Sequence, residues 1–126
     1  MPSAFIDDGY TLTATLPGKE GEYEPCEITY RPLVRLEHFR YSTQVQKWFD
    51  KDGLKREHLT DLDRLYADLI AGSNGWTQKL LEWDMVNSQG EAVAINPENL
   101  LRIHPRMFAA MIDVFFPSEA EDAEKN

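Results

Sequence analysis

The sequence predicts one α+β domain, in which two β-hairpins pack with three to four α-helices. Apolar and polar residues alternate with a period of two in residues 10–31 and again in 80–95, as in half-buried strands. In 33–51, 60–72 and 97–116, apolar residues instead recur at three- and four-residue spacing, which indicates helices that cover a core. We expect residues 1–8 to form a flexible arm, 9–117 the domain, and 118–126 an acidic disordered tail.

The first predicted hairpin lies in residues 10–31. Apolar residues at positions 10, 12, 14 and 16 alternate with threonines at 11, 13 and 15, which favours a strand with one buried face. Pro17 breaks this strand, and Gly18 and Gly21 supply a turn. A second strand begins at Cys26 and ends before Pro32, because proline has no N–H for a neighbouring strand.

A first helix is predicted from about Leu33 until Asp52–Gly53 stops it. Its apolar stripe consists of Val34, Tyr41, Val45, Trp48 and Phe49. Leu36 and Phe39 do not fit the stripe, so either the helix begins later than Leu33 or a second face is covered.

A second helix is predicted from an N-cap at Thr60 to Gly72, the natural residue after a helix end. Its apolar stripe consists of Leu62, Leu65, Tyr66, Leu69 and Ile70. The second hairpin then follows in residues 80–95, with its turn at 87–90.

Two further helices are predicted near the end of the chain. Asn96 caps the first, with Pro97 at its first position, and Pro105 can begin the last. The last helix carries Phe108, Met111, Ile112 and Phe115 on one face. We expect the core to include Tyr10, Leu12, Ile28, Trp48, Leu62, Leu69, Trp83, Val93, Leu101, Phe108 and Ile112.

Composition and charge limit the function classes. The net charge of −9 argues against binding nucleic-acid phosphates and favours high solubility. Cys26 is the only cysteine, which excludes an internal disulfide and fits a reducing compartment. We see no signal peptide and no apolar run long enough to span a membrane, and expect a cytoplasmic protein.

The residue types that carry catalysis or bind metals do not form a known motif. His38, His58 and His104 lack the spacing of metal ligands, and no second cysteine accompanies Cys26. The glycines of residues 72–75 lack the strand and lysine of a phosphate loop. We therefore predict no catalytic, cofactor or metal site, and a protein that is not an enzyme.

Charge distribution indicates a protein-binding surface instead. Residues 31–56 hold seven Lys or Arg and three acids, which opposes the sign of the whole chain. Three of these bases share one side of the first predicted helix, and three apolar residues are left over from the core. The predicted partner-binding residues are Leu36, Phe39, Arg40, Lys47, Lys51 and Phe116. The basic side would meet either an acidic surface of the same protein, which allows a homo-oligomer, or an acidic partner.

Several short motifs follow one another in the C-terminal half. They are Leu80–Val86 around Trp83-Asp84, Gly90, Val93–Ile95, Pro97–Leu101, His104-Pro105 and Ile112-Asp113. Over about residues 59–116 the chain resembles the tail assembly chaperones encoded by tailed phages and prophages. The resemblance implies a non-enzymatic, soluble protein made in the infected or lysogenic bacterium. Such a protein would bind the tape-measure or tail-tube protein before tail assembly.

Two other classes remain open. One is a small acidic protein-binding module or an inhibitor of a host protein, which would need its acids aligned on one face if it mimics nucleic acid. The other is a small enzyme with a cleft between the hairpins, which would need polar groups that converge in a pocket.

Overall fold

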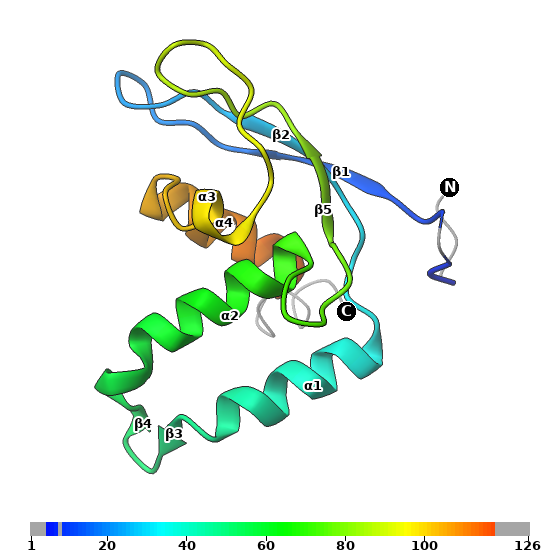
Figure 1. The fold of residues 1–126 in the computed structure, drawn as a ribbon, viewed down its shortest axis with the longest axis vertical. Coiled ribbons are helices and arrows are strands. Elements are labelled where there is room, and N and C mark those ends of the chain that lie inside the picture. The colour runs from blue at the N-terminus through cyan, green and yellow to red at the C-terminus, as the bar shows by residue number, and fades with distance from the viewer. Residues whose placement is uncertain (1–4, 8, 118–126) are drawn as a thin grey trace.

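The structure is a computed structural model that describes residues 5–7 and 9–117 (Figure 1). In chain order the elements are β1 (Leu12–Leu16), β2 (Cys26–Tyr30), α1 (Arg35–Gln46), β3 (Phe49–Asp50), β4 (Gly53–Leu54), a 3₁₀ turn (Arg56–His58), α2 (Leu59–Ala71), β5 (Leu80–Trp83), α3 (Pro97–Leu100) and α4 (Pro105–Phe115). The predicted α+β class is confirmed. The predicted tail lies outside the described residues, as does most of the predicted arm.

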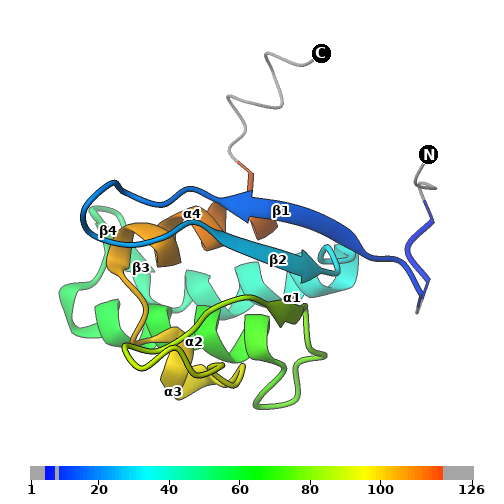
Figure 2. The same ribbon diagram turned by 90° about the horizontal axis from the view of Figure 1, so that it is seen from above.

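β1, β2 and β5 form an antiparallel sheet with β2 in the middle. In the first pair Leu16 lies opposite Cys26 and Ala14 opposite Ile28, so the first hairpin is confirmed. On the other side of β2, Ile28 lies opposite Trp83. These side chains share the face of the sheet that the helices cover (Figure 2).

The second predicted hairpin forms only in part. β5 pairs with β2 rather than with residues 92–95, and the expected ladder is reduced to one bridge between Val86 and Ala92. The turn itself closes, with Gly90 N–H donating to the Asn87 carbonyl. The Trp83 indole N–H donates to the Val93 carbonyl at 2.7 Å. β5 thus takes its backbone partners from β2, and not from residues 92–95 as the sequence predicted.

α1 ends earlier than predicted, at Gln46. β3 and β4 follow as a two-stranded hairpin, whose turn needs Gly53 at a φ of 109°. A 3₁₀ turn then leads into α2, and His58 rather than Thr60 takes the N-cap position. At its other end α2 stops as predicted at Gly72, where φ is 81°.

The starts of the last two helices also follow the prediction. The Asn96 side chain accepts the Asn99 N–H at 2.8 Å, and Pro97 takes the first helical position of α3. Pro105 begins α4, where the His104 ring caps the Arg106 N–H. Both caps satisfy amides that a helix start leaves without an intrahelical partner.

The core lies between the sheet and the helices. Its buried apolar residues are Leu16, Cys26, Ile28, Leu33, Leu65, Ala67, Leu69, Ile70, Trp76, Leu80, Leu100, Met107, Met111 and Phe115. Of the residues predicted to be in the core, Ile28 and Leu69 are buried, while Tyr10, Leu12, Trp48, Leu62, Trp83, Val93, Phe108 and Ile112 are half-buried. The prediction for Leu101 was wrong: α3 ends after Leu100, and Leu101 is 42% exposed.

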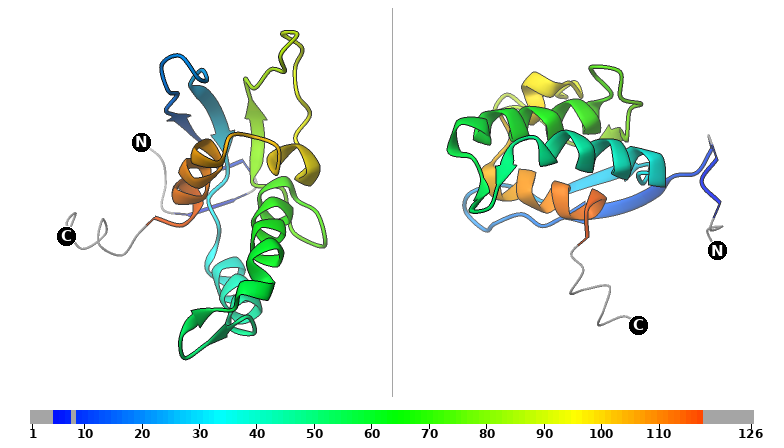
Figure 3. Two further views of the ribbon diagram at one scale, coloured as in Figure 1. Left: turned by 90° about the vertical axis from the view of Figure 1, so that its left-hand side faces the viewer. Right: turned by 90° about the horizontal axis from the view of Figure 1, so that it is seen from below.

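α1 and α2 run antiparallel to each other on the side of the domain away from β1 and β2 (Figure 3). α4 lies beneath the sheet and contacts β1, and α3 packs against α2. In this arrangement neither the sheet nor α4 covers the outer side of α1.

No helix in the described part of the chain has the length and apolarity needed to cross a membrane.

Candidate functional site

α1 supplies the surface that the rest of the domain leaves open. None of its residues is buried. Its inner side, with Tyr41 and Val45, packs against the core without entering it. Its outward residues are all exposed, and we call them the α1 outer face: Arg35, Leu36, Phe39, Ser42, Thr43 and Gln46.

The start of α1 is fixed by Glu37. Its carboxylate accepts the Val34 N–H at 2.9 Å, which satisfies an amide at the helix start. The same carboxylate forms an ion pair with the ammonium of Lys79, whose side chain is only 5% exposed. The Lys79 backbone in turn joins two other segments, donating to the Ile70 carbonyl and accepting from the Arg31 N–H. One buried lysine thus connects α1, α2 and the residue that follows β2.

An aromatic cluster holds the middle of α1 against α2 and α4. The Tyr41 and Tyr66 hydroxyls lie 2.5 Å apart, and both rings contact the ring of Phe116. Burial, followed by the hydrogen bond with Tyr66, raises the pKa of Tyr41. His38 meets the same Phe116 ring edge to face. Phe116 was predicted to be exposed, but it is half-buried and contacts three rings.

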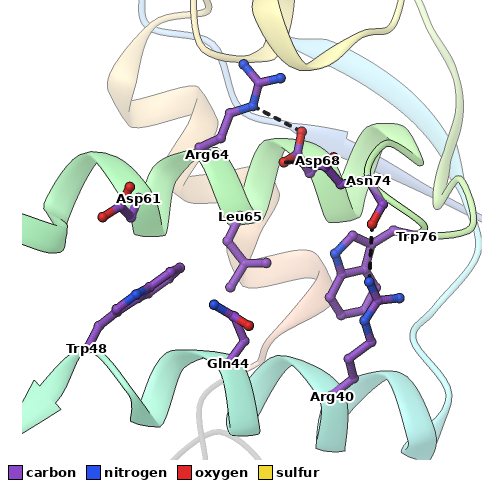
Figure 4. A pocket seen from close by; sticks show the side chains of 9 residues that line it. All are labelled: Arg40, Gln44, Trp48, Asp61, Arg64, Leu65, Asp68, Asn74 and Trp76. Carbon is purple, nitrogen blue, oxygen red and sulfur yellow. Dashed lines mark hydrogen bonds and ion pairs between the residues drawn. The ribbon is translucent and has the colours of Figure 1, made fainter.

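Arg40 points away from the α1 outer face and toward the loop after α2 (Figure 4). Its guanidinium carbon lies 3.9 Å from the ring centroid of Trp76. It also donates to the carbonyls of Asn74 and Gly75, at 3.2 and 3.1 Å. Arg40 thus holds α1 to this loop, and it does not belong to the basic stripe that the sequence suggested.

Lys51 does not belong to that stripe either, because it lies in the turn between β3 and β4. Lys47 is the residue that follows α1, and it is exposed. The base that does lie beside the exposed apolar residues is Arg35, one turn before Phe39. Arg35 was not among the predicted residues because the sequence did not fix where the first helix begins.

The cleft between α1 and α2 has a volume of about 320 Å³. Arg40 and Gln44 point into it from α1, Trp48 from the turn after α1, and Leu65 from α2 (Figure 4). Asp61, the carboxylate nearest Trp48 in the view, is bound to His58 Nδ1 at 2.8 Å.

Three further polar side chains around this cleft, Arg64, Asp68 and Asn74, also have partners. Asp68 is 4% exposed and accepts from Arg64 Nε at 3.1 Å and from Asn74 Nδ2 at 2.7 Å. Arg64 further contacts Glu98. The polar side chains therefore bond mainly with one another and do not converge on a shared point in the cleft.

The most exposed apolar side chains of α1 are Leu36, at 79%, and Phe39, at 70%. They lie three residues apart, so they are neighbours on the helix surface. Both were predicted to be partner-binding residues left over from the core, and the structure does place them in solvent. Together with Arg35 they form an apolar and basic patch on a helix of an acidic protein.

The groups that most often carry catalysis or bind metals lie apart. Cys26 is buried in β2, and burial, followed by a hydrogen bond with Asp84, raises its thiol pKa to about 12. His38 contacts Phe116, His58 stacks on Trp48, and His104 stacks on Tyr23. Within the described residues, no three His, Cys, Asp or Glu side chains come together in an arrangement that could hold a metal ion.

Comparisons of the chain with known protein families, with curated proteins and with solved structures found no significant match.

Proposed function

We propose that the protein is a non-enzymatic tail assembly chaperone of a phage or prophage. It would act in the cytoplasm of the bacterial host and bind the tape-measure or tail-tube protein through the α1 outer face. The short motifs of residues 80–113 support the resemblance to tail assembly chaperones. The exposed Leu36 and Phe39 support binding through the α1 outer face.

The exposed apolar pair is the observation that carries the proposal. Leaving two large apolar side chains in water forgoes the stabilisation that burial would give, roughly 1.5–3 kcal/mol for each when fully buried. The same helix uses Glu37, Arg40 and Tyr41 to hold a fixed position on the domain. A rigid helix with an apolar patch is the usual partner of another apolar helix or groove.

Charge indicates the chemistry of the partner segment. The α1 outer face contains Arg35, is followed by exposed Lys47, and includes no acid. The complementary segment is therefore apolar and carries acidic residues at its border. Exposed ion pairs contribute only about 0–1 kcal/mol each, so the bases orient the partner and speed its association while the apolar contact holds it.

The test is binding of the purified tape-measure and tail-tube proteins of the same phage to Leu36→Asp and Phe39→Asp variants. Both variants should fold like the wild type, because neither side chain packs in the core, and both should lose binding. The matched control is Leu101→Asp, at an exposed leucine outside the α1 outer face. Wild-type binding by both variants would refute this surface as the interface. Failure of the wild type to bind either protein would refute the chaperone function.

The electrostatic part has its own test. Arg35→Glu/Lys47→Glu should slow association at low salt, with a smaller effect at high salt, where screening already weakens the attraction. Arg102→Glu/Arg106→Glu changes the net charge equally at exposed positions outside the α1 outer face and should leave the rate closer to the wild type. If the two double variants associate at equal rates, Arg35 and Lys47 do not attract the partner, and only the apolar contact of the proposal stands.

A further inference from the structure

β1 is an outer strand of the three-stranded sheet, and its hydrogen-bonding directions can be worked out from β2. Glu27 uses its backbone N–H and C=O toward Asp84, the residue after β5, and Arg31, the residue after β2, donates its N–H to Lys79, the residue before β5. Both positions therefore face β5. Because backbone groups alternate along a strand, Cys26, Ile28 and Tyr30 face β1.

The register then fixes the directions in β1. Leu12, Ala14 and Leu16 lie opposite those three residues and use their backbone groups toward β2. Thr13 and Thr15, and Thr11 just before the strand, therefore direct their N–H and C=O groups away from the sheet. No described segment outside the sheet forms a backbone hydrogen bond with these threonines, and β1 forms the border of the sheet in Figure 2.

This edge lacks the features that usually prevent strand pairing. β1 reads LTATL, without charge, proline or glycine, and residues 11, 13 and 15 are exposed threonines. The opposite edge is different: β5 is shorter, carries Glu82, and continues into a loop that its own Trp83 indole binds. β1 is thus the edge at which the sheet is open to another strand.

We infer that β1 pairs with β1 of a second copy of this chain, antiparallel and around a two-fold axis at Thr13. In this register Thr13 faces Thr13 of the other copy and Thr11 faces Thr15, so each outward donor meets an acceptor. Threonines opposite one another are a favourable cross-strand pair.

The charge distribution favours this edge for a contact between two copies of the chain. Each copy carries −9, so two copies repel wherever their charged surfaces meet. The β1 edge contains no charged side chain, and an isologous pair of neutral strands closes on itself. Two three-stranded sheets would become one continuous sheet, and the α1 outer face lies on the side of the domain away from β1.

The first experiment measures mass against protein concentration for the full chain. The wild type should shift from monomer to dimer as concentration rises, and added salt should strengthen the dimer because it screens the repulsion. Thr13→Lys should weaken dimerisation by at least about tenfold, equivalent to about 1.4 kcal/mol. Thr43→Lys adds the same charge on α1 and should dimerise like the wild type.

A second variant separates the edge from general destabilisation. Thr13→Pro removes an N–H that points away from β2, so the β1–β2 pairs stay intact while each copy loses one intermolecular donor. Circular dichroism should show that the variant is folded, and its measured mass should be that of a monomer. A wild type that stays monomeric at all concentrations and salts, or a dimer that survives both substitutions at Thr13, would overturn the inference.

Cross-linking tests the register. In a hydrogen-bonded antiparallel pair the facing Cα atoms lie about 5.5 Å apart, within the range of a disulfide. Thr13→Cys should therefore give a covalent dimer under mild oxidation. Thr15→Cys should not, since its two copies would lie four residues apart along the strands, roughly 13 Å. Native Cys26 is buried and should give no cross-link in the wild type. Equal cross-linking by both variants would refute the Thr13-centred pairing.

Discussion

The guanidinium of Arg40 lies over the indole of Trp76, with 3.9 Å between the guanidinium carbon and the ring centroid. The two residues are far apart in the sequence, and their contact joins α1 to the loop that connects α2 with β5. Two carbonyls of that loop, from Asn74 and Gly75, accept hydrogen bonds from the same guanidinium. Since α1 buries no residue of its own, such contacts determine where its outer face lies.

Arg40→Ala should therefore lower the free energy of unfolding by about 1–2 kcal/mol, through loss of the cation–π contact and the hydrogen bonds. Urea unfolding followed by tryptophan fluorescence measures this change. Arg35→Ala is the matched control, because Arg35 is exposed on the α1 outer face, and its effect should stay within about 0.5 kcal/mol. Equal effects of the two substitutions would mean that the Arg40–Trp76 contact contributes nothing.

The Glu37–Lys79 pair gives a second prediction. Glu37→Gln keeps an oxygen for the Val34 N–H but leaves the Lys79 ammonium buried without its counter-charge, which should cost about 3–5 kcal/mol. Lys79→Met should cost less, because the Glu37 side chain is 17% exposed and keeps its bond to Val34.

The double variant Glu37→Gln/Lys79→Met distinguishes an ion pair from two independent contacts. It should be more stable than Glu37→Gln alone, since the buried charge is gone. A double variant whose loss equals the sum of the single losses would show that the two side chains do not interact. Thermal unfolding of the wild type, the two single variants and the double variant gives the four stabilities that this comparison needs.

α4 provides a third prediction, on the packing of the core. Met111 is fully buried, so Met111→Ala should lower the free energy of unfolding by about 2–5 kcal/mol. Phe108 was expected on the same apolar face but is only half-buried. Phe108→Ala should therefore cost less than Met111→Ala, although it removes a larger side chain. If Phe108→Ala cost more stability than Met111→Ala in chemical denaturation, the result would support the apolar face of α4 that the sequence predicted.

α4 is an element whose start and period the sequence predicts, but whose buried face it does not. The start at Pro105 and the helical period were predictable from local residues, but Met107, Met111 and Phe115 form the buried face. Phe108 and Ile112 fit the same period when the helix is rotated slightly. A sequence with apolar residues on nearly half of a helix does not specify which of them faces the sheet, because that depends on where the helix is docked.

The candidate site was predictable to a similar degree. Leu36 and Phe39 stood out because they did not fit the stripe of their helix, and that local signal identified exposed residues. Arg40, Lys51 and Phe116 were misplaced because their positions depend on distant partners or on an early helix end: Arg40 on Trp76, Lys51 on the β3–β4 turn, and Phe116 on Tyr41 and Tyr66. Neither residue type nor spacing encodes contacts between segments more than thirty residues apart.

The last prediction concerns Cys26 and alkaline pH. Burial raises the pKa of its thiol to about 12, so the folded chain keeps a proton that the unfolded chain releases above about pH 8.5. Between these two values the unfolded state binds fewer protons than the folded state. The free energy of unfolding should therefore fall as pH rises through this window, while below it Cys26 adds no pH dependence.

Urea unfolding of the wild type and of Cys26→Ala, measured from pH 7 to pH 11, tests this prediction. The wild type should lose its stability advantage over the variant as pH increases. Both proteins should still decline, because burial also raises the pKa of Tyr30 and Tyr41. In the folded wild type a thiol reagent at pH 8 should react far more slowly than in urea, since the reactive thiolate is almost absent. Equal rates in the two conditions would show that the thiol is accessible and ionises normally.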